Sequence, residues 1–461
     1  MKHLFGKTAR AALALAIAAI APLAFAQNTI RIGLITDKVG PAKAYAEPVA
    51  QGAIFAVKEL NAKGGLLGRQ IELLVEDDQG KPDVSATAAR KLVDAGAAFI
   101  LSVSLTPATQ QAQSVTLETK TPHMTPSNSG DTLTTQITNP NFWQTGPLAS
   151  TQIATLLSYA RNKNYKRVAL VTENSALGQL TNQFFKAGLE KSGIQVVSEE
   201  VVPGGSTSAD PQMQKVRASN AEAIFMTGVT VPENSLILRS YRQLGLKIPV
   251  LANYNLSIPV YSSIARGLLD GVVFVDAFDP AKAETRRFID SYKKDTGVDA
   301  YNLNGYGYDG IMLAVDAIKR AGSTDKDKVR EAMQATKAFA GVMGGVGTSY
   351  GFSDGKRTGF DTGGMVVRVY EGDLQGKVVH VGAKCPSFWN WWSVPPPAAA
   401  CTRWWPWPTC SSRGPPASST LPSASGPWWR RLAVLSPCRV MQFPMLPACC
   451  WWCWRCLPSA G

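Results

Sequence analysis

The sequence has 461 residues and a formal net charge of +13, from 47 Lys and Arg against 34 Asp and Glu. Most of the excess lies at the two ends, and residues 27–384 carry only +4, which gives no indication of a nucleic-acid partner. These 358 residues contain no cysteine, so they hold no disulfide, and they suffice for two cores.

Residues 1–26 are predicted to be a secretory signal peptide. Three basic side chains precede an apolar run at residues 11–20, and Ala24-Phe25-Ala26 is a typical cleavage site. The apolar run is too short to cross a bilayer, and residue 27 is Gln, so no lipid anchor is expected. The mature protein is therefore expected in the periplasm.

The first half of the remaining chain alternates strands with helices. The strands are short apolar runs, and the helices repeat apolar residues at helical spacing. Asp83 is the expected N-cap of the second helix. The predicted strands are 29–36, 70–76, 97–101 and 122–125, and the helices are 47–62, 83–93 and 107–119.

The pattern restarts after about residue 146. Strands are predicted at 167–172, 194–201, 222–227, 248–252 and 271–275. Helices are predicted at 148–162, 178–191, 211–219, 233–244, 281–295, 303–320 and 325–336. The glycine-rich run 341–347 lacks the Gly-Lys-Ser/Thr ending of a phosphate loop and is interpreted as a flexible connection.

Residues 385–461 differ from the rest of the chain. They contain all eight cysteines and eleven of the twelve tryptophans, but no Asp, Glu or Lys. This composition fits neither a packed domain nor ordinary disorder, so the segment is interpreted as an out-of-frame, unfolded tail. The spacing of Cys450, Cys453 and Cys456 is accordingly not taken as a metal site.

Repeated strand–helix alternation predicts an α/β protein with two doubly wound parallel-sheet lobes. Lobe one is expected at 28–146 plus 276–352, and lobe two at 147–275 plus 353–384. Three crossing segments near Gly146, Asp276 and Ser353 would form the hinge. Ligands of such sheets bind outside the carboxyl ends of the strands, which places the predicted site between the lobes.

Several motifs near the start of the chain resemble those of a known family. These motifs are Gly40-Pro41, Tyr45, Gly52-Ala53 and the block LNAKGGLLGRQIELLVEDD at 60–78. They resemble the corresponding residues of the leucine/isoleucine/valine-binding proteins, which are type I periplasmic solute-binding proteins of ABC importers. The resemblance extends from about Thr29 to about Tyr370. Gly64, Gly65 and Gly68 suit the tight turn from helix to strand. Asp77 and Asp78 suit either a ligand role or solvated turn positions.

The resemblance implies ligand contacts in lobe one. A hydroxyl at the start of the helix after the third strand would hold a carboxylate, and this residue is Thr106, which also suits an N-cap. The loop after the fourth strand would contribute Ser127 and Ser129. Tyr45 matches an aromatic residue that covers the ligand, although a buried tyrosine can equally belong to a core.

The lobe-two positions depart from the family pattern. Aromatic residues of the family fall on Leu177 and Val229, and the acid that holds an amino acid's ammonium falls near Tyr254. Residues 253–258 contain no acid, although Asp276 or Asp309 could substitute. A small carboxylate without an α-ammonium is therefore favoured over leucine or valine.

The predicted function is a periplasmic binding component of a branched-chain-amino-acid-type ABC importer. It would take a small carboxylate or amino-acid-like solute, pair with a permease at the inner membrane, act as a monomer and need no cofactor or metal. An enzyme is disfavoured because residues 27–384 contain only two histidines, no cysteine and no nucleophile-elbow motif. The alternative is a ligand-sensing domain with the same fold.

The interpretation of the tail leads to a first prediction. A shortened chain of residues 27–384 should unfold as cooperatively as the full-length protein, because the tail would contribute no core. Denaturant unfolding followed by circular dichroism of both chains measures this. Loss of cooperative unfolding on removal of residues 385–461 would contradict the interpretation.

Overall fold

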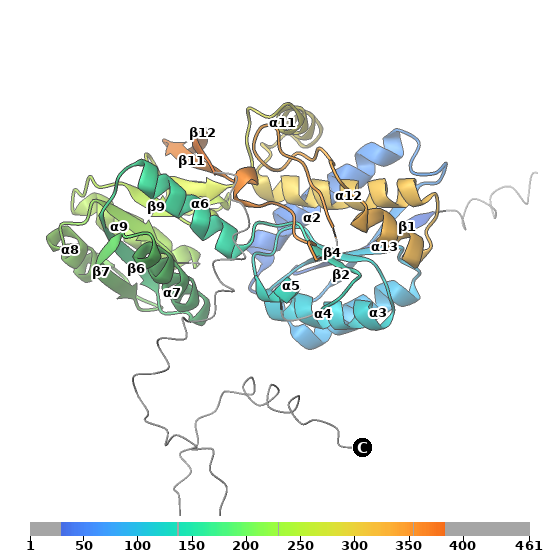
Figure 1. Ribbon diagram of the computed structural model, residues 1–461, viewed down its shortest axis with the longest axis horizontal. Coiled ribbons are helices and arrows are strands. Elements are labelled where there is room, and N and C mark those ends of the chain that lie inside the picture. The colour runs from blue at the N-terminus through green and yellow to red at the C-terminus, as the bar shows by residue number, and fades with distance from the viewer. Residues whose placement is uncertain (1–28, 136–137, 229, 354, 383–461) are drawn as a thin grey trace, which may run out of the picture. The chain divides into compact units, whose positions relative to one another are not determined.

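The computed structural model describes residues 29–135, 138–228, 230–353 and 355–382 (Figure 1). The predicted signal peptide and tail lie outside these ranges. Within them the α/β prediction is confirmed: two sheets of mainly parallel strands are flanked by helices. No helix in the described ranges is long and apolar enough to cross a membrane.

The first sheet contains five parallel strands in the order β2-β1-β3-β4-β5. The strands are β1 (Ile30–Thr36), β2 (Ile71–Asp77), β3 (Phe99–Val103), β4 (His123–Thr125) and β5 (Phe142–Gln144). One face packs against α2 (Lys43–Ala62) and α12 (Asn302–Ala321), and the other against α3 (Pro82–Asp94) and α4 (Thr106–Glu118) (Figure 1). The short α5 (Thr132–Thr135) and α13 (Lys326–Gln334) complete this group.

Glycines let α2 and α12 come close together although they lie about 250 residues apart in the chain. A Cβ atom at Gly52 would collide with the carbonyl of Asn304, and one at Gly307 would collide with that of Val49. Burial of these two helices against the sheet therefore requires glycine at both positions, since a side chain would push the helices apart.

The second sheet contains seven strands in the order β12-β11-β10-β9-β8-β6-β7. The parallel strands are β6 (Arg167–Glu173), β7 (Gln195–Val202), β8 (Ala223–Met226), β9 (Val250–Ala252) and β10 (Val273–Asp276). The antiparallel hairpin β11 (Val366–Glu371) and β12 (Leu374–Val381) adds to β10. The helices of this group are α6 (Ala149–Asn162), α7 (Ala176–Lys191), α8 (Asp210–Ala218), α9 (Val231–Gln243) and α10 (Tyr261–Ile264), with 3-10 turns η1 (Tyr254–Ser257) and η2 (Thr362–Gly364). Helix α11 (Ala283–Thr296) packs instead against α2, where its Phe288 and Tyr292 contact Phe55.

Most predicted elements are found within a few residues of their expected bounds, and the exceptions have local causes. The N-cap of α3 is Lys81, because Pro82 occupies the first helical position, and Asp83 lies in the first turn. The turn after α2 uses Gly64, Gly65 and Gly68 at positive φ, as predicted.

The run 341–347 is not a loose connection. The backbone N–H groups of Val342 and Met343 donate to the Asp309 carboxylate, at 2.8 and 2.9 Å. Lys282 Nζ donates to the Met343 carbonyl at 2.7 Å. These buried charge-assisted hydrogen bonds hold the run 341–347 in place. No sequence motif predicts them.

His123 is a buried, neutral histidine in the core of the first sheet. Its Nε2 lies 2.7 Å from Ser102 Oγ and its Nδ1 lies 3.0 Å from Thr116 Oγ1. Thr116 Oγ1 also donates to the Gln113 carbonyl, so His123 Nδ1–H donates and Nε2 accepts from Ser102. Burial lowers the pKa of His123 to about 3.

The depressed pKa of His123 predicts an acid-sensitive fold. The unfolded chain binds a proton below about pH 6.5 and the folded chain does not, so stability is full above that pH and falls as the pH drops toward 3. Between pH 7 and pH 5 this histidine removes about 2 kcal/mol of stability. Denaturant unfolding at both pH values should show a larger loss of unfolding free energy between pH 7 and pH 5 in the wild type than in His123→Gln. Equal losses in the two proteins would contradict the prediction. Asp309, whose pKa burial raises to about 6, has the opposite effect on stability, but this effect is common to both proteins and cancels in the comparison.

Candidate ligand-binding site

The predicted lobe-one residues lie where strands of the first sheet end. Tyr45 lies in α2, shortly after β1, Thr106 begins α4 after β3, and Ser127 and Ser129 follow β4. Carboxyl ends of parallel strands meet at one edge of a sheet, and polar groups there face a potential ligand. The structure places all four residues at this edge.

Ser127 is the point at which elements from both sheets meet. Its carbonyl accepts a long hydrogen bond of 3.4 Å from the hydroxyl of Tyr254, which follows β9 of the second sheet. Its own hydroxyl is buried and, within the described ranges, makes no well-formed hydrogen bond, though it lies close enough to Tyr45 to lower that residue's pKa. Burial has the larger effect and raises the pKa of Tyr45 to about 12. Tyr45, Ser127 and Tyr254 therefore form a cluster of protonated hydroxyls.

Tyr306 extends this cluster and was missed in the sequence. It lies in α12, with its ring edge-on to Tyr254 at a centroid distance of 6.4 Å. Burial, followed by the nearby Asp276 and Tyr45, raises its pKa well above the ordinary value. Its hydroxyl is buried without a hydrogen-bond partner among the described residues. In the sequence, Tyr306 cannot be told from a core residue, because the apolar face of the helix surrounds it. We call Tyr45, Ser127, Tyr254 and Tyr306 the hydroxyl cluster.

Thr106 and Ser129 lie beside the cluster and point to other partners. Thr106 is the first residue of α4 and Leu105 is its N-cap, so the Thr106 hydroxyl does not cap the helix as predicted. It donates instead to Asn128 Oδ1 at 3.0 Å. Ser129 Oγ accepts from Gln152 Nε2 at 3.1 Å, and Gln152 Oε1 accepts from the Tyr254 backbone N–H at 3.3 Å. Gln152 thus links Ser129 to Tyr254.

The two remaining predicted residues are not tested. Val229 and the side chain of Leu177 lie outside the described part of the structure. Glu173, a buried acid at the end of β6 that the sequence analysis did not single out, lies against Gly178 and Gly228. It accepts from the Ser175 hydroxyl at 2.6 Å, and Ser175 Oγ caps α7 by accepting from Gly178 N–H. These bonds give Glu173 a structural role at the start of α7.

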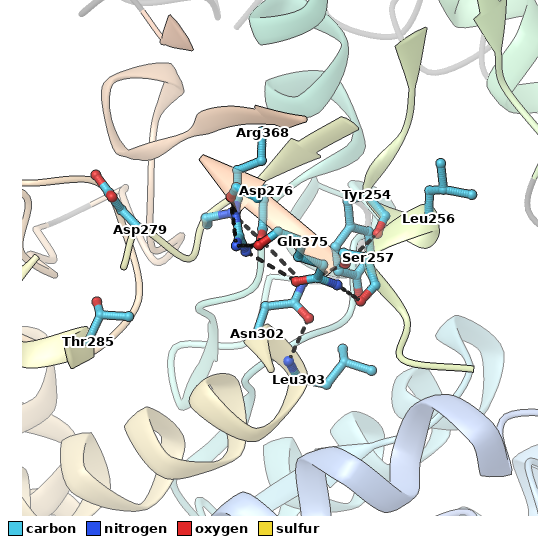
Figure 2. Close-up of polar contacts among 12 residues, drawn as sticks. Tyr254, Leu256, Ser257, Asp276, Asp279, Thr285, Asn302, Leu303, Arg368 and Gln375 are labelled. Atoms are coloured by element: carbon cyan, nitrogen blue, oxygen red, sulfur yellow. Dashed lines mark hydrogen bonds and ion pairs between the residues drawn. The ribbon is translucent and has the colours of Figure 1, made fainter. Parts of the chain in front are cut away.

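Asp276, one of the acids that could replace the missing carboxylate, is already engaged. It lies 3.1 Å from Arg368 of β11, and the two side chains are 0% and 4% exposed. Figure 2 shows Asn302, at the start of α12, donating to Asp276 Oδ1 and to Ser257 Oγ, while Arg368 also donates to Gln375. Burial raises the pKa of Asp276, and Arg368 opposes that rise. Its charge is balanced within the protein.

Asp309, the other candidate acid, is engaged as well. Its oxygens accept from two backbone N–H groups of the run 341–347 and from the Tyr350 hydroxyl at 3.0 Å. Asp77 and Asp78 accept hydrogen bonds from backbone N–H groups of the turn that follows β2. These bonds favour a structural role in the turn over a ligand-binding role. The described residues contain no group of three or more His, Cys, Asp or Glu able to hold a metal ion.

Comparison with known proteins agrees with this geometry. A family model described as "Periplasmic binding protein" matches residues 29–368. The Leu/Ile/Val-binding protein BraC3 of Rhizobium johnstonii is 29% identical over 344 residues, covering 74% of this chain and 92% of that protein. The leucine-, isoleucine-, valine-, threonine- and alanine-binding protein of Pseudomonas aeruginosa is 25% identical, with 73% and 90% covered.

Solved structures show the same fold. The leucine-binding protein LivK of Thermotoga maritima superposes with a TM-score of 0.66 at 24% identity, covering 77% of this chain and 99% of that one. LivJ of Streptococcus pneumoniae, in complex with isoleucine, has a TM-score of 0.67 at 22% identity, with 76% and 99% covered.

The two sheets with a polar cluster between their carboxyl-end loops define a two-lobed binding protein of type I. The chain belongs to the periplasmic binding protein family, and its resemblance to the leucine/isoleucine/valine-binding proteins is confirmed.

The buried ion pair gives a prediction for stability. Arg368→Met leaves the Asp276 carboxylate buried without its partner and should lower the free energy of unfolding by about 3–5 kcal/mol. Lys63→Met, which breaks the exposed helical pair with Glu59, should cost no more than about 0.5 kcal/mol. Urea unfolding of both variants measures the contrast, and similar small losses in the two would show that the ion pair is not needed.

Proposed function

We propose that this chain is the solute-binding component of an ABC importer, acting in the periplasm. It binds a small carboxylate or amino-acid-like solute between the carboxyl edges of its two sheets. The hydroxyl cluster carries the proposal, since its members come from elements after β1, β4 and β9 and from α12. Unpartnered buried hydroxyls are costly unless a ligand or water satisfies them.

The lobe boundaries and the hinge are part of this proposal. Lobe one comprises 28–146 and 276–359, lobe two comprises 147–275 and 360–384, and ligand closes the lobes by rigid-body rotation. The third crossing shifts toward the C-terminus, because Thr358 pairs with Gln144 at the edge of the first sheet. A crossing after Gly359 fits this pairing better than one at Ser353.

The names of the relatives support transport over the other functions. The curated relatives are named as binding proteins for branched-chain amino acids, and LivJ is named a transporter substrate-binding protein. We therefore propose a non-enzymatic, monomeric protein that delivers its solute to a membrane permease. A ligand-sensing domain is the second candidate, and no observation favours it.

Removal of the Ser127 hydroxyl tests the site. Ser127→Ala should leave the ligand-free stability within about 0.5 kcal/mol of wild type, because that hydroxyl has no well-formed hydrogen bond to lose. It should weaken carboxylate binding about tenfold, the value of one hydrogen bond to a charged group. Ser114→Ala, on the exposed face of α4, is the matched control and should change neither.

Thermal unfolding of the full-length protein with benzoate, 4-methylpentanoate, 3-phenylpropanoate, leucine and phenylalanine supplies the readout. A ligand at about 100 times its dissociation constant stabilises the fold by about 2.7 kcal/mol. The proposal fails if none of these compounds raises the unfolding temperature, or if Ser127→Ala and Ser114→Ala bind them equally well.

A further inference from the structure

The hydroxyl cluster offers donors that lack acceptors. The hydroxyls of Ser127 and Tyr306 are both completely buried and have no well-formed hydrogen bond within the described ranges. Burial raises the pKa of Tyr45 to about 12 and those of Tyr254 and Tyr306 well above the ordinary value, so each of these three phenols holds its proton at neutral pH. Convergent O–H donors suit an oxygen anion.

Two acceptors beside the cluster, in contrast, already accept hydrogen bonds. The Ser127 carbonyl accepts from the Tyr254 hydroxyl, and Gln152 Oε1 accepts from the Tyr254 backbone. A hydroxyl oxygen can still accept a hydrogen bond, but it carries no charge to balance an ammonium.

The buried carboxylates near the cluster are engaged too. Asp276 is paired with Arg368, and Asp309 is held by backbone N–H groups and by Tyr350. An ammonium in the site would therefore lie beside donors and neutral dipoles, since Asp276 and Asp309 are engaged and Glu173 accepts from the Ser175 hydroxyl. A buried charge without a partner lowers affinity steeply.

We infer that Tyr254 makes this site selective for carboxylates that lack an α-ammonium. Tyr254 contributes twice, since its hydroxyl donates to the Ser127 carbonyl and its backbone N–H donates to Gln152 Oε1, which leaves each of these neutral oxygens one lone pair and no charge for an ammonium. The inference rests on the proposed function and narrows the class of solute to aliphatic or aromatic acids.

The contribution of the α-ammonium to affinity can be measured with pairs of ligands that differ only in this group. Leucine differs from 4-methylpentanoate, and phenylalanine from 3-phenylpropanoate, only by the α-ammonium. Titration calorimetry on the full-length protein should show at least one acid binding about 100-fold or more tightly than its amino acid, equivalent to about 2.7 kcal/mol. Equal affinities, or a preference for the amino acid, would overturn the inference.

Two substitutions at Tyr254 test the residue itself. Tyr254→Phe keeps the ring and releases the Ser127 carbonyl, so the preference for the acid should narrow by about tenfold. Tyr254→Glu adds a carboxylate and should reverse the preference toward the amino acid. An unchanged preference in Tyr254→Phe, with wild-type stability, would show that Tyr254 is not the selecting residue.

Glu173→Gln distinguishes the rival arrangement. If the wild type prefers leucine and Glu173→Gln abolishes that binding, Glu173 holds the ammonium and the inference is overturned, while the proposed function stands. If no acid and no amino acid binds, the proposed function falls, and the inference falls with it.

Discussion

All strands of a parallel sheet end at the same edge, and this constraint shapes the rest of the molecule. The backbone groups and polar side chains that follow β1, β3 and β4 must gather at one edge of the first sheet, and those that follow β6, β8 and β9 at one edge of the second. The Tyr254–Ser127 hydrogen bond joins a loop from each edge. The hydroxyl cluster accordingly combines residues that follow strands with Tyr45 of α2 and Tyr306 of α12, which lie beside them.

Within the described part of the chain, the hydroxyl cluster contains unpaired hydrogen-bond donors, whereas the acids Asp276 and Asp309 near it are engaged. Acids in the neighbourhood serve the fold: Asp276 neutralises Arg368 and anchors α12 through Asn302, and Asp309 fixes the run 341–347. Because these two charges are balanced within the protein, the proposed site presents mainly neutral hydroxyl donors. Relatives named for branched-chain amino acids share the family, but the solute of this chain follows from its own side chains.

The sequence predicts the fold well because strand and helix signals are strong and local. Buried runs such as 167–172 and helices such as 303–320 are found within one residue of their predicted bounds. Strand β12 was missed because it is a largely polar edge strand without the apolar run of a buried strand. Strand β11 was also missed, although it carries such a run.

The site is predictable only in part. Tyr45, Ser127 and Tyr254 are brought together as expected from the family resemblance, but their mutual contacts depend on tertiary geometry. Tyr306 was missed because its helical position is that of a core residue. The pairing of Asp276 with Arg368 joins residues 92 positions apart, which no local pattern indicates.

A crystal structure of the full-length protein grown with 3-phenylpropanoate would show which groups hold the carboxylate. We expect its oxygens to lie within hydrogen-bond distance of Ser127 Oγ and Tyr306 Oη, with Tyr254 still bonded to the Ser127 carbonyl. A ligand bound away from these hydroxyls, or a Tyr254 side chain displaced from Ser127 by the ligand, would contradict this expectation.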